Sequence, residues 1–244
     1  MKLFLTSVAS CLDSIDSFKK LLNSQTRLVV LPFSYHEDYI NCADDIYMHF
    51  DRCPSNKESI YWSTVRPFID AGISSEKITI INQFVDTPQY IKYKLSRPNT
   101  VVYLPGGYPE KIVQNIIDYD LYNAIRECEI IVGESAGSMA PFADFFVYKD
   151  PDYPRYKRYK GLNLVRNMTF IPHFEFSNKY VLDACRRFNK HRPKVKIFCV
   201  MDGGYLVIDN GKLVDYEKAY ICGYCKKKFK KQIGKFIELI KDLI

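Results

Sequence analysis

Short apolar runs, many of them rich in β-branched residues, recur along the chain and are separated by longer segments, several of which have helical spacing. TRLVVLPFS, TVVYLPGG and EIIVGES are such runs, and four apolar residues recur every four to five positions between the last two: Ile112, Ile116, Leu121 and Ile125. Strands that are apolar on both faces need cover on both faces, which is typical of parallel sheets flanked by helices. The pattern predicts an α/β fold with a doubly wound, mostly parallel sheet.

The C-terminal part of the chain has a different pattern. In GGYLVIDNGKLVDYEKAY, two alternating runs flank Asn210-Gly211. Asn-Gly is the strongest short-range hairpin signal, because both central residues of the tight turn need positive φ. We therefore expect an antiparallel hairpin at one edge of the sheet. With no internal repeat or low-complexity linker, the sequence favours a single α/β domain over residues 1–244.

Composition narrows the class of protein. Hydrophobic residues make up 47% of the chain, enough for a large core. Much of the net charge of +7 comes from the segment CKKKFKKQIGK, and such a lysine run more often forms the solvated face of a helix than a binding surface. No apolar stretch approaches the length of a membrane span, and KLFLTS is typical of a first strand. The eight cysteines form no framework, and Cys222–Cys225 is an isolated CxxC. We expect a cytoplasmic protein without metal, cofactor, nucleic-acid partner or membrane contact.

Two glycine-containing segments follow predicted strands, at the sheet edge where doubly wound proteins bind ligands. In YLPGGYPE, Gly106 and Gly107 have no side chains, so their backbone amides could donate to an oxyanion. A Gly-Gly pair is equally compatible with an ordinary turn between a strand and a helix. In VGESAGSMA, Ser135 lies between two glycines in the strand–turn–helix context of a nucleophile elbow. The amides of Gly107 and Ala136 are then the candidate oxyanion donors.

A serine nucleophile needs a base, because its hydroxyl is protonated at neutral pH. The chain has four histidines, of which three lie in contexts that favour surface or structural roles: His36, His49 and His191. His173, in MTFIPHFEF, follows a predicted strand and Pro172, at the same sheet edge as Ser135. The sequence therefore predicts His173 as the base.

The acid that would orient His173 is left open by the sequence. Asp150 lies between the serine and the histidine, in the chain order of many hydrolases, and Asp152 is close to it. Glu175 shares a strand face with His173, so it could bind the imidazole or contact substrate. Glu134, directly before the nucleophile, could hold a substrate amine or act as a helix-start carboxylate.

The segments LPGGYPE, VGESAGSMA, GLNLV and IPHFE, in this order, resemble the dipeptidase E and cyanophycinase family of serine peptidases. The resemblance implies a flavodoxin-like, class I glutamine amidotransferase-like fold and a Ser-His-Asp/Glu hydrolase that needs no cofactor. It also favours Asp150, since dipeptidase E has its acid at the same separation from the serine. The arginine-bearing segment that recognises an N-terminal aspartate in dipeptidase E has no counterpart in EFSNKYVLDACRRFNK, which leaves the carry-over of aspartyl-dipeptide specificity open.

These features predict a serine hydrolase that cleaves small peptides through an acyl-enzyme, with Ser135, His173 and Asp150 as its triad. PGGYPE also resembles amidotransferase domains, so a glutaminase-like enzyme is an alternative, although that chemistry uses a cysteine where this chain has Ser135. A binding protein that has kept the fold without catalysis is a second alternative. The oligomeric state is open, and a homodimer is one option.

Overall fold

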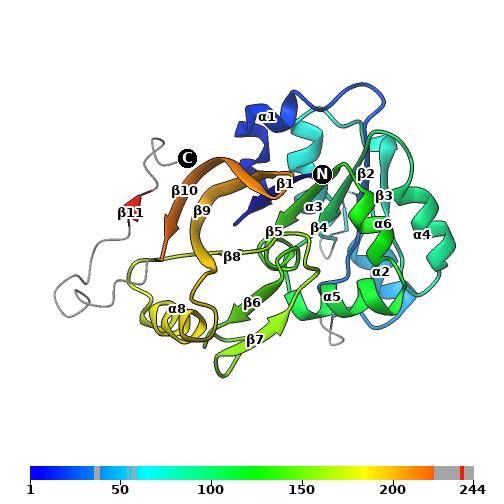
Figure 1. Ribbon diagram of the computed structural model, residues 1–244. Coiled ribbons are helices and arrows are strands. Elements are labelled where there is room, and N and C mark those ends of the chain that lie inside the picture. The colour runs from blue at the N-terminus through cyan, green and yellow to red at the C-terminus, as the bar shows by residue number, and fades with distance from the viewer. Residues whose placement is uncertain (36–38, 54, 57–58, 223–236, 239–244) are drawn as a thin grey trace.

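A sheet with five adjoining parallel strands runs through the centre of the computed structural model (Figure 1). The structure describes residues 1–35, 39–53, 55–56, 59–222 and 237–238. Its strands are β1 (Lys2–Thr6), β2 (Arg27–Val30), β3 (Ile78–Ile80), β4 (Thr100–Leu104), β5 (Ile130–Glu134), β6 (Asp144–Val147), β7 (Lys157–Lys160), β8 (Met168–Ile171), β9 (Lys196–Asp209), β10 (Lys212–Ile221) and β11 (Ile237–Glu238). Its helices are η1 (Ala9–Ser14), α1 (Asp16–Lys19), α2 (Ala43–His49), α3 (Tyr61–Asp70), η2 (Ser75–Lys77), α4 (Pro88–Leu95), α5 (Pro109–Asp118), α6 (Tyr122–Glu127), α7 (Ala136–Met139) and α8 (Lys179–His191).

The strand order of the main sheet is β3-β2-β4-β5-β1-β9-β10-β11, and β8 pairs with the first part of β9. β1 lies parallel to β5, with Thr6 opposite Glu134. β9 runs antiparallel to β1 on its other side. The predicted mostly parallel sheet is confirmed: the run of five parallel strands ends at β1, and β9 pairs antiparallel with β1 and parallel with β8. The carboxyl ends of β1 and β5 therefore meet at one edge of the sheet.

Helices cover both faces of this sheet, as the apolar strands require. Leu3 and Leu5 of β1 pack in one cluster with buried side chains of α4, α5 and α6. Phe4, between them, points to the opposite face and packs with η1, α1 and α3. The two-residue period of a strand thus divides one continuous apolar run between two cores.

The predicted C-terminal hairpin is confirmed as the antiparallel pair β9–β10 (Figure 1). Asn210 and Gly211 form its turn with φ values of 47° and 79°. Both residues thus have the positive φ on which the prediction rested. The lysine run after residue 225 and Cys225 lie outside the described residues.

The helical spacing after β4 belongs to two helices rather than one. α5 ends at Asp118, and Asp120 has φ 52°, a left-handed conformation that stops a helix. The amide of Leu121 donates to the carbonyl of Ile116 at 2.8 Å across this break. The five-residue interval between these two apolar residues, longer than a helical step, marks the break in the sequence.

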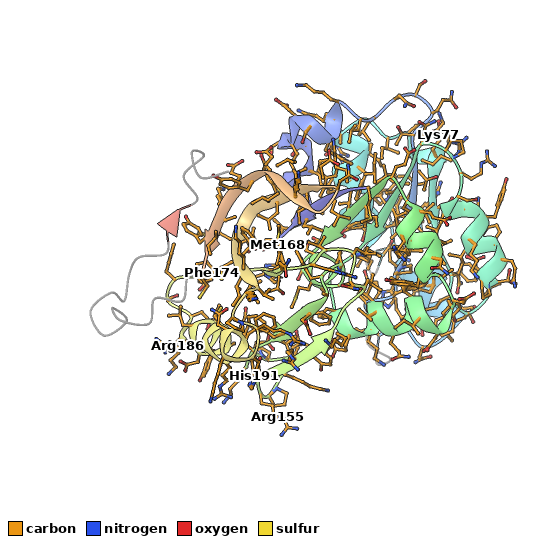
Figure 2. All side chains as sticks on the ribbon, viewed as in Figure 1. Lys77, Arg155, Met168, Phe174, Arg186 and His191 are labelled. Atoms are coloured by element: carbon orange, nitrogen blue, oxygen red, sulfur yellow. The ribbon has the colours of Figure 1, made fainter. Side chains whose placement is uncertain are left out.

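A smaller layer lies beside the end of the main sheet. β6 and β7 form an antiparallel pair, and Phe146 of β6 packs with Phe188 of α8 at a ring-centroid distance of 4.7 Å. Figure 2 shows His191 at the end of α8, at the lower edge of the molecule, in keeping with the surface role expected from the sequence. Within the described part of the chain, every helix is too short or too polar to cross a bilayer.

Candidate active site

Ser135 occupies a strained turn between β5 and α7. Its backbone has φ 48° and ψ −110°, outside the regions that residues with a Cβ ordinarily adopt. Two hydrogen bonds fix the turn: the Ser135 amide donates to the carbonyl of Thr6 at 2.9 Å, and the Ser138 amide donates to the carbonyl of Ser135 at 3.0 Å. From this turn the Ser135 hydroxyl reaches His173.

The two glycines that flank this turn are required by close backbone contacts. A Cβ on Gly133 would lie 2.5 Å from the carbonyl oxygen of Gly137, and a Cβ on Gly137 would lie 1.8 Å from the carbonyl oxygen of Leu104. Neither distance leaves room for a methyl group. The strand, the turn and the helix therefore pack as closely as the G-x-S-x-G pattern requires.

His173 and Asp202 complete a hydrogen-bonded chain with the serine. His173 Nε2 lies 3.0 Å from Ser135 Oγ, and His173 Nδ1 lies 2.7 Å from Asp202 Oδ1. A carboxylate at Nδ1 holds the proton there and leaves Nε2 free to accept one from the serine. The histidine and aspartate side chains are 46% and 64% exposed, so these hydrogen-bonded residues are open to solvent. The arrangement can activate the Ser135 hydroxyl as a nucleophile.

Asp202 carries the negative charge that the hydrogen-bonded row of Ser135, His173 and Asp202 requires. Burial acts to raise the pKa of Asp202, but hydrogen bonds with Ser7 and His173 and the charge of His173 outweigh it. The pKa of Asp202 is consequently held below its ordinary value of 3.8. The carboxylate is ionised at neutral pH and can stabilise a protonated imidazole.

The structure does not bring Asp150 to His173. The carboxylate of Asp150 instead accepts hydrogen bonds from the amides of Asp152, at 2.9 Å, and Tyr153, at 2.7 Å. The resulting turn lets the Tyr153 hydroxyl donate to Glu110 at the start of α5, at 2.7 Å. The expectation for Asp150 is therefore corrected: its carboxylate shapes a loop, and Asp202 is the acid at the imidazole.

Among the described residues, neither of the two other candidate acids hydrogen-bonds the imidazole. Glu175 Oε2 accepts a long hydrogen bond of 3.4 Å from Ser177 and is exposed. Asp152 is exposed beside Asp150.

His49 Nε2 lies 3.1 Å from the carbonyl oxygen of Tyr39, in a structural contact, whereas His36 lies outside the described residues.

The sequence contained a signal for Asp202 that was missed. β8 and β9 are adjacent and parallel, with Ile171 opposite Cys199. His173 follows the first of these residues by two positions and Asp202 follows the second by three. In each strand the polar side chain comes directly after an apolar run, and parallel neighbours bring such positions together. The missing information was that these two strands pair.

The Gly106-Gly107 loop lies next to the nucleophile turn. A Cβ on Gly106 would lie 3.4 Å from Ser135 Cβ. Gly107 has φ 132°, and a Cβ there would lie 2.5 Å from the carbonyl oxygen of Ser34. The same carbonyl accepts from the Tyr108 amide at 2.7 Å, and the Ser34 hydroxyl donates to the carbonyl of Gly106. Ser34 thus holds the loop through these hydrogen bonds. Because both loop residues are glycines, no side chain of the pair lies beside Ser135.

Glu134 is held by the protein itself. Its Oε1 accepts from the Ala9 amide at 3.0 Å, and its Oε2 accepts from the hydroxyl of Tyr103, which is fully buried. Burial and then the Glu134 charge raise the pKa of Tyr103 well above its ordinary value, so this hydroxyl remains a donor. Both carboxylate oxygens therefore bind the chain next to the nucleophile turn, which favours a structural role over substrate binding.

Replacing Tyr103 with phenylalanine should destabilise the protein by about 1–3 kcal/mol, because a partly buried carboxylate oxygen loses its donor. Urea unfolding followed by circular dichroism measures this change. Tyr93→Phe is a suitable control, since Tyr93 is 52% exposed on α4. An unchanged unfolding midpoint in the Tyr103 variant would show that this hydrogen bond does not stabilise the turn.

Comparison with known proteins identifies a family and a solved structure that this chain resembles. The sequence profile of peptidase family S51 matches residues 55–215, which is more than half of the chain. Among solved structures, the chain is similar to a protein from Listeria monocytogenes EGD-e described as a candidate peptidase E, with a TM-score of 0.58 and 17% sequence identity. The match covers 89% of this chain and 98% of the other. No curated protein matches the chain by sequence.

The described residues contain no group of three or more histidine, cysteine or acidic side chains placed to hold a metal ion.

The profile match spans the Gly-Gly loop, the nucleophile turn, His173 and Asp202. The chain belongs to peptidase family S51, the dipeptidase E family, and is a serine-type peptidase.

Proposed function

We propose that this protein hydrolyses small peptides through an acyl-enzyme on Ser135, with His173 as the base and Asp202 as the acid that orients it. The observation that carries the proposal is the continuous chain of contacts from Ser135 Oγ to His173 Nε2, at 3.0 Å, and from His173 Nδ1 to Asp202 Oδ1, at 2.7 Å. The contacts have the geometry that a nucleophile, a general base and an orienting carboxylate require.

In the first half of the reaction, Ser135 Oγ attacks the scissile carbonyl while His173 Nε2 takes the hydroxyl proton. The protonated imidazole, stabilised by Asp202, then gives this proton to the leaving amine as the C–N bond breaks. In the second half, water attacks the acyl-enzyme while His173 Nε2 takes a proton from it, and the protonated imidazole then gives this proton to Ser135 Oγ as the ester bond breaks.

The oxyanion of each tetrahedral intermediate would be bound by the amides of Ala136 and Gly107. Ala136 is the first residue of α7, and the first amides of a helix have no acceptor within it. Gly107 belongs to the loop that lies next to the nucleophile, since a Cβ on its neighbour Gly106 would lie 3.4 Å from Ser135 Cβ. Donors fixed in advance at this position stabilise developing charge by about 2.7–4 kcal/mol each.

The test is intact-protein mass spectrometry after reaction with a fluorophosphonate. The wild-type chain should gain one phosphonyl group, and both Ser135→Ala and His173→Ala should remain unlabelled over the same time. His191→Ala is the matched control, since His191 is exposed at the end of α8. A dipeptide library then identifies the preferred substrate.

A folded wild-type protein that reacts with no fluorophosphonate would refute the proposed mechanism. Labelling that persists in Ser135→Ala would place the reactive serine elsewhere. Release of ammonia from glutamine by the wild-type protein, without cleavage of any dipeptide, would favour the glutaminase alternative.

A further inference from the structure

The acid of the proposed triad is unusually open to solvent. The side chain of Asp202 is 64% exposed, and an exposed carboxylate is screened by water and free to rotate unless another group holds it. Its position within β9 fixes its Cα but not its χ angles. An anchor that reaches Asp202 from the protein interior is therefore needed if the carboxylate is to stay at His173 Nδ1.

Ser7 is that anchor. Its hydroxyl donates to Asp202 Oδ1 at 2.9 Å and accepts from the backbone amide of His173 at 2.7 Å. Ser7 Oγ also lies 3.4 Å from His173 Nδ1. The side chain of Ser7 is fully buried, so its hydroxyl is shielded from water. One hydroxyl therefore touches both the acid and the base.

Ser7 itself is fixed by the sheet. It directly follows β1, and its amide donates to the carbonyl of Gly204 in β9 at 3.2 Å. The preceding residue, Thr6, accepts the amide of Ser135. The segment from Thr6 to Ser7 thus contacts the backbone or side chains of all three triad residues, and it carries the rigidity of the sheet to them.

The backbone of His173 gives Ser7 a second task. His173 has φ 51°, a left-handed conformation that is unfavourable for a residue with a Cβ and persists only where surrounding contacts hold it. The hydrogen bond from the His173 amide to Ser7 is one of these contacts. Without it the amide would be left without this acceptor, and the imidazole could move away from Ser135.

We propose that Ser7 is a positioning residue that locks Asp202 and His173 together, so that the imidazole keeps its tautomer and its distance from Ser135. The inference rests on the proposed function, since it describes how that site is held. Ser7 acts only through hydrogen bonds: its proton stays on its own oxygen, shared with Asp202, throughout the reaction. It does not touch the substrate.

The experiment compares second-order rate constants for fluorophosphonate labelling of Ser135. Ser7→Ala should react about 10–100-fold more slowly than wild type, since small displacements at a reacting centre have effects of this size. Ser7→Cys keeps the volume but forms weak hydrogen bonds and should be similarly slow. Ser59→Ala is the matched control: the Ser59 hydroxyl also makes three hydrogen bonds, with His49, Asp51 and Tyr61, away from the triad.

A double-mutant cycle separates positioning from general loss of structure. If Ser7 acts through Asp202 and His173, the Ser7→Ala/Asp202→Ala double variant should react within about threefold of Asp202→Ala alone. Proton NMR gives a second readout. The far-downfield resonance of the His173 Nδ1 proton, expected in wild type and in Ser59→Ala, should be lost or broadened in Ser7→Ala.

Several results would overturn the inference. Labelling of Ser7→Ala at the wild-type rate, or effects of the two substitutions that multiply in the double variant, would show that Ser7 does not act through the acid. A retained downfield resonance would show the same. If Ser7→Ala does not fold, the same comparisons are made with Ser7→Cys. An unlabelled wild-type protein would instead contradict the proposed function, so the two failures are distinct.

Discussion

Replacing Asp202 with asparagine is expected to slow fluorophosphonate labelling of Ser135 by about 10³–10⁴-fold, with little change in the folded structure. The asparagine amide can donate to Nδ1 of His173, and the imidazole then carries its proton on Nε2. In that tautomer it cannot accept the proton of Ser135 Oγ, which lies 3.0 Å away. The rate constant from time-resolved mass spectrometry measures the effect directly.

Asp150→Asn is the matched control for this substitution. The Asp150 carboxylate oxygen accepts from two backbone amides, and an asparagine carbonyl can do the same. We expect its labelling rate to stay within about threefold of wild type, because the loop keeps its turn. The opposite ranking, with Asp150→Asn slow and Asp202→Asn fast, would contradict the placement of Asp202 as the acid.

Replacing Gly137 with alanine is expected to destabilise the protein by about 4 kcal/mol or more, the size of effect found when a substitution disrupts the packing of a core. The new Cβ would lie 1.8 Å from the carbonyl oxygen of Leu104 and 2.9 Å from Leu104 Cβ. Both groups belong to the central strand β4, so neither can move without disturbing the sheet. Relative to a typical stability of about 5–15 kcal/mol, this loss leaves a marginal fold.

Gly72→Ala is the control, because a Cβ at Gly72 would have no atom within 4 Å and only the backbone conformation, φ 116°, opposes it. Its cost should be about 1–3 kcal/mol. Urea unfolding measures both variants, and labelling of Ser135 reports whether the turn is intact. A Gly137→Ala variant as stable as Gly72→Ala would show that α7 can move away from β4 at little cost.

The sequence by itself determined the features that follow local rules. Buried strands need cover on both faces, which predicted the parallel sheet. Asn210-Gly211 needs positive φ at two positions, which predicted the hairpin. Ser135 lies between two glycines directly after an apolar strand, which predicted its tight turn. These predictions depend on periodicity and backbone conformation within short segments, so no long-range contact had to be known.

Tertiary structure alone decided the acid and its anchor. Asp202 lies 29 residues after His173 and Ser7 lies 166 residues before it. Their meeting depends on β9 pairing with both β8 and β1, and many strand orders are compatible with the same apolar runs. Separation along the chain favoured Asp150, but a carboxylate is selected by where its strand is placed in the sheet. Pairing between strands is a long-range property, and it places Asp202 and Ser7 beside His173.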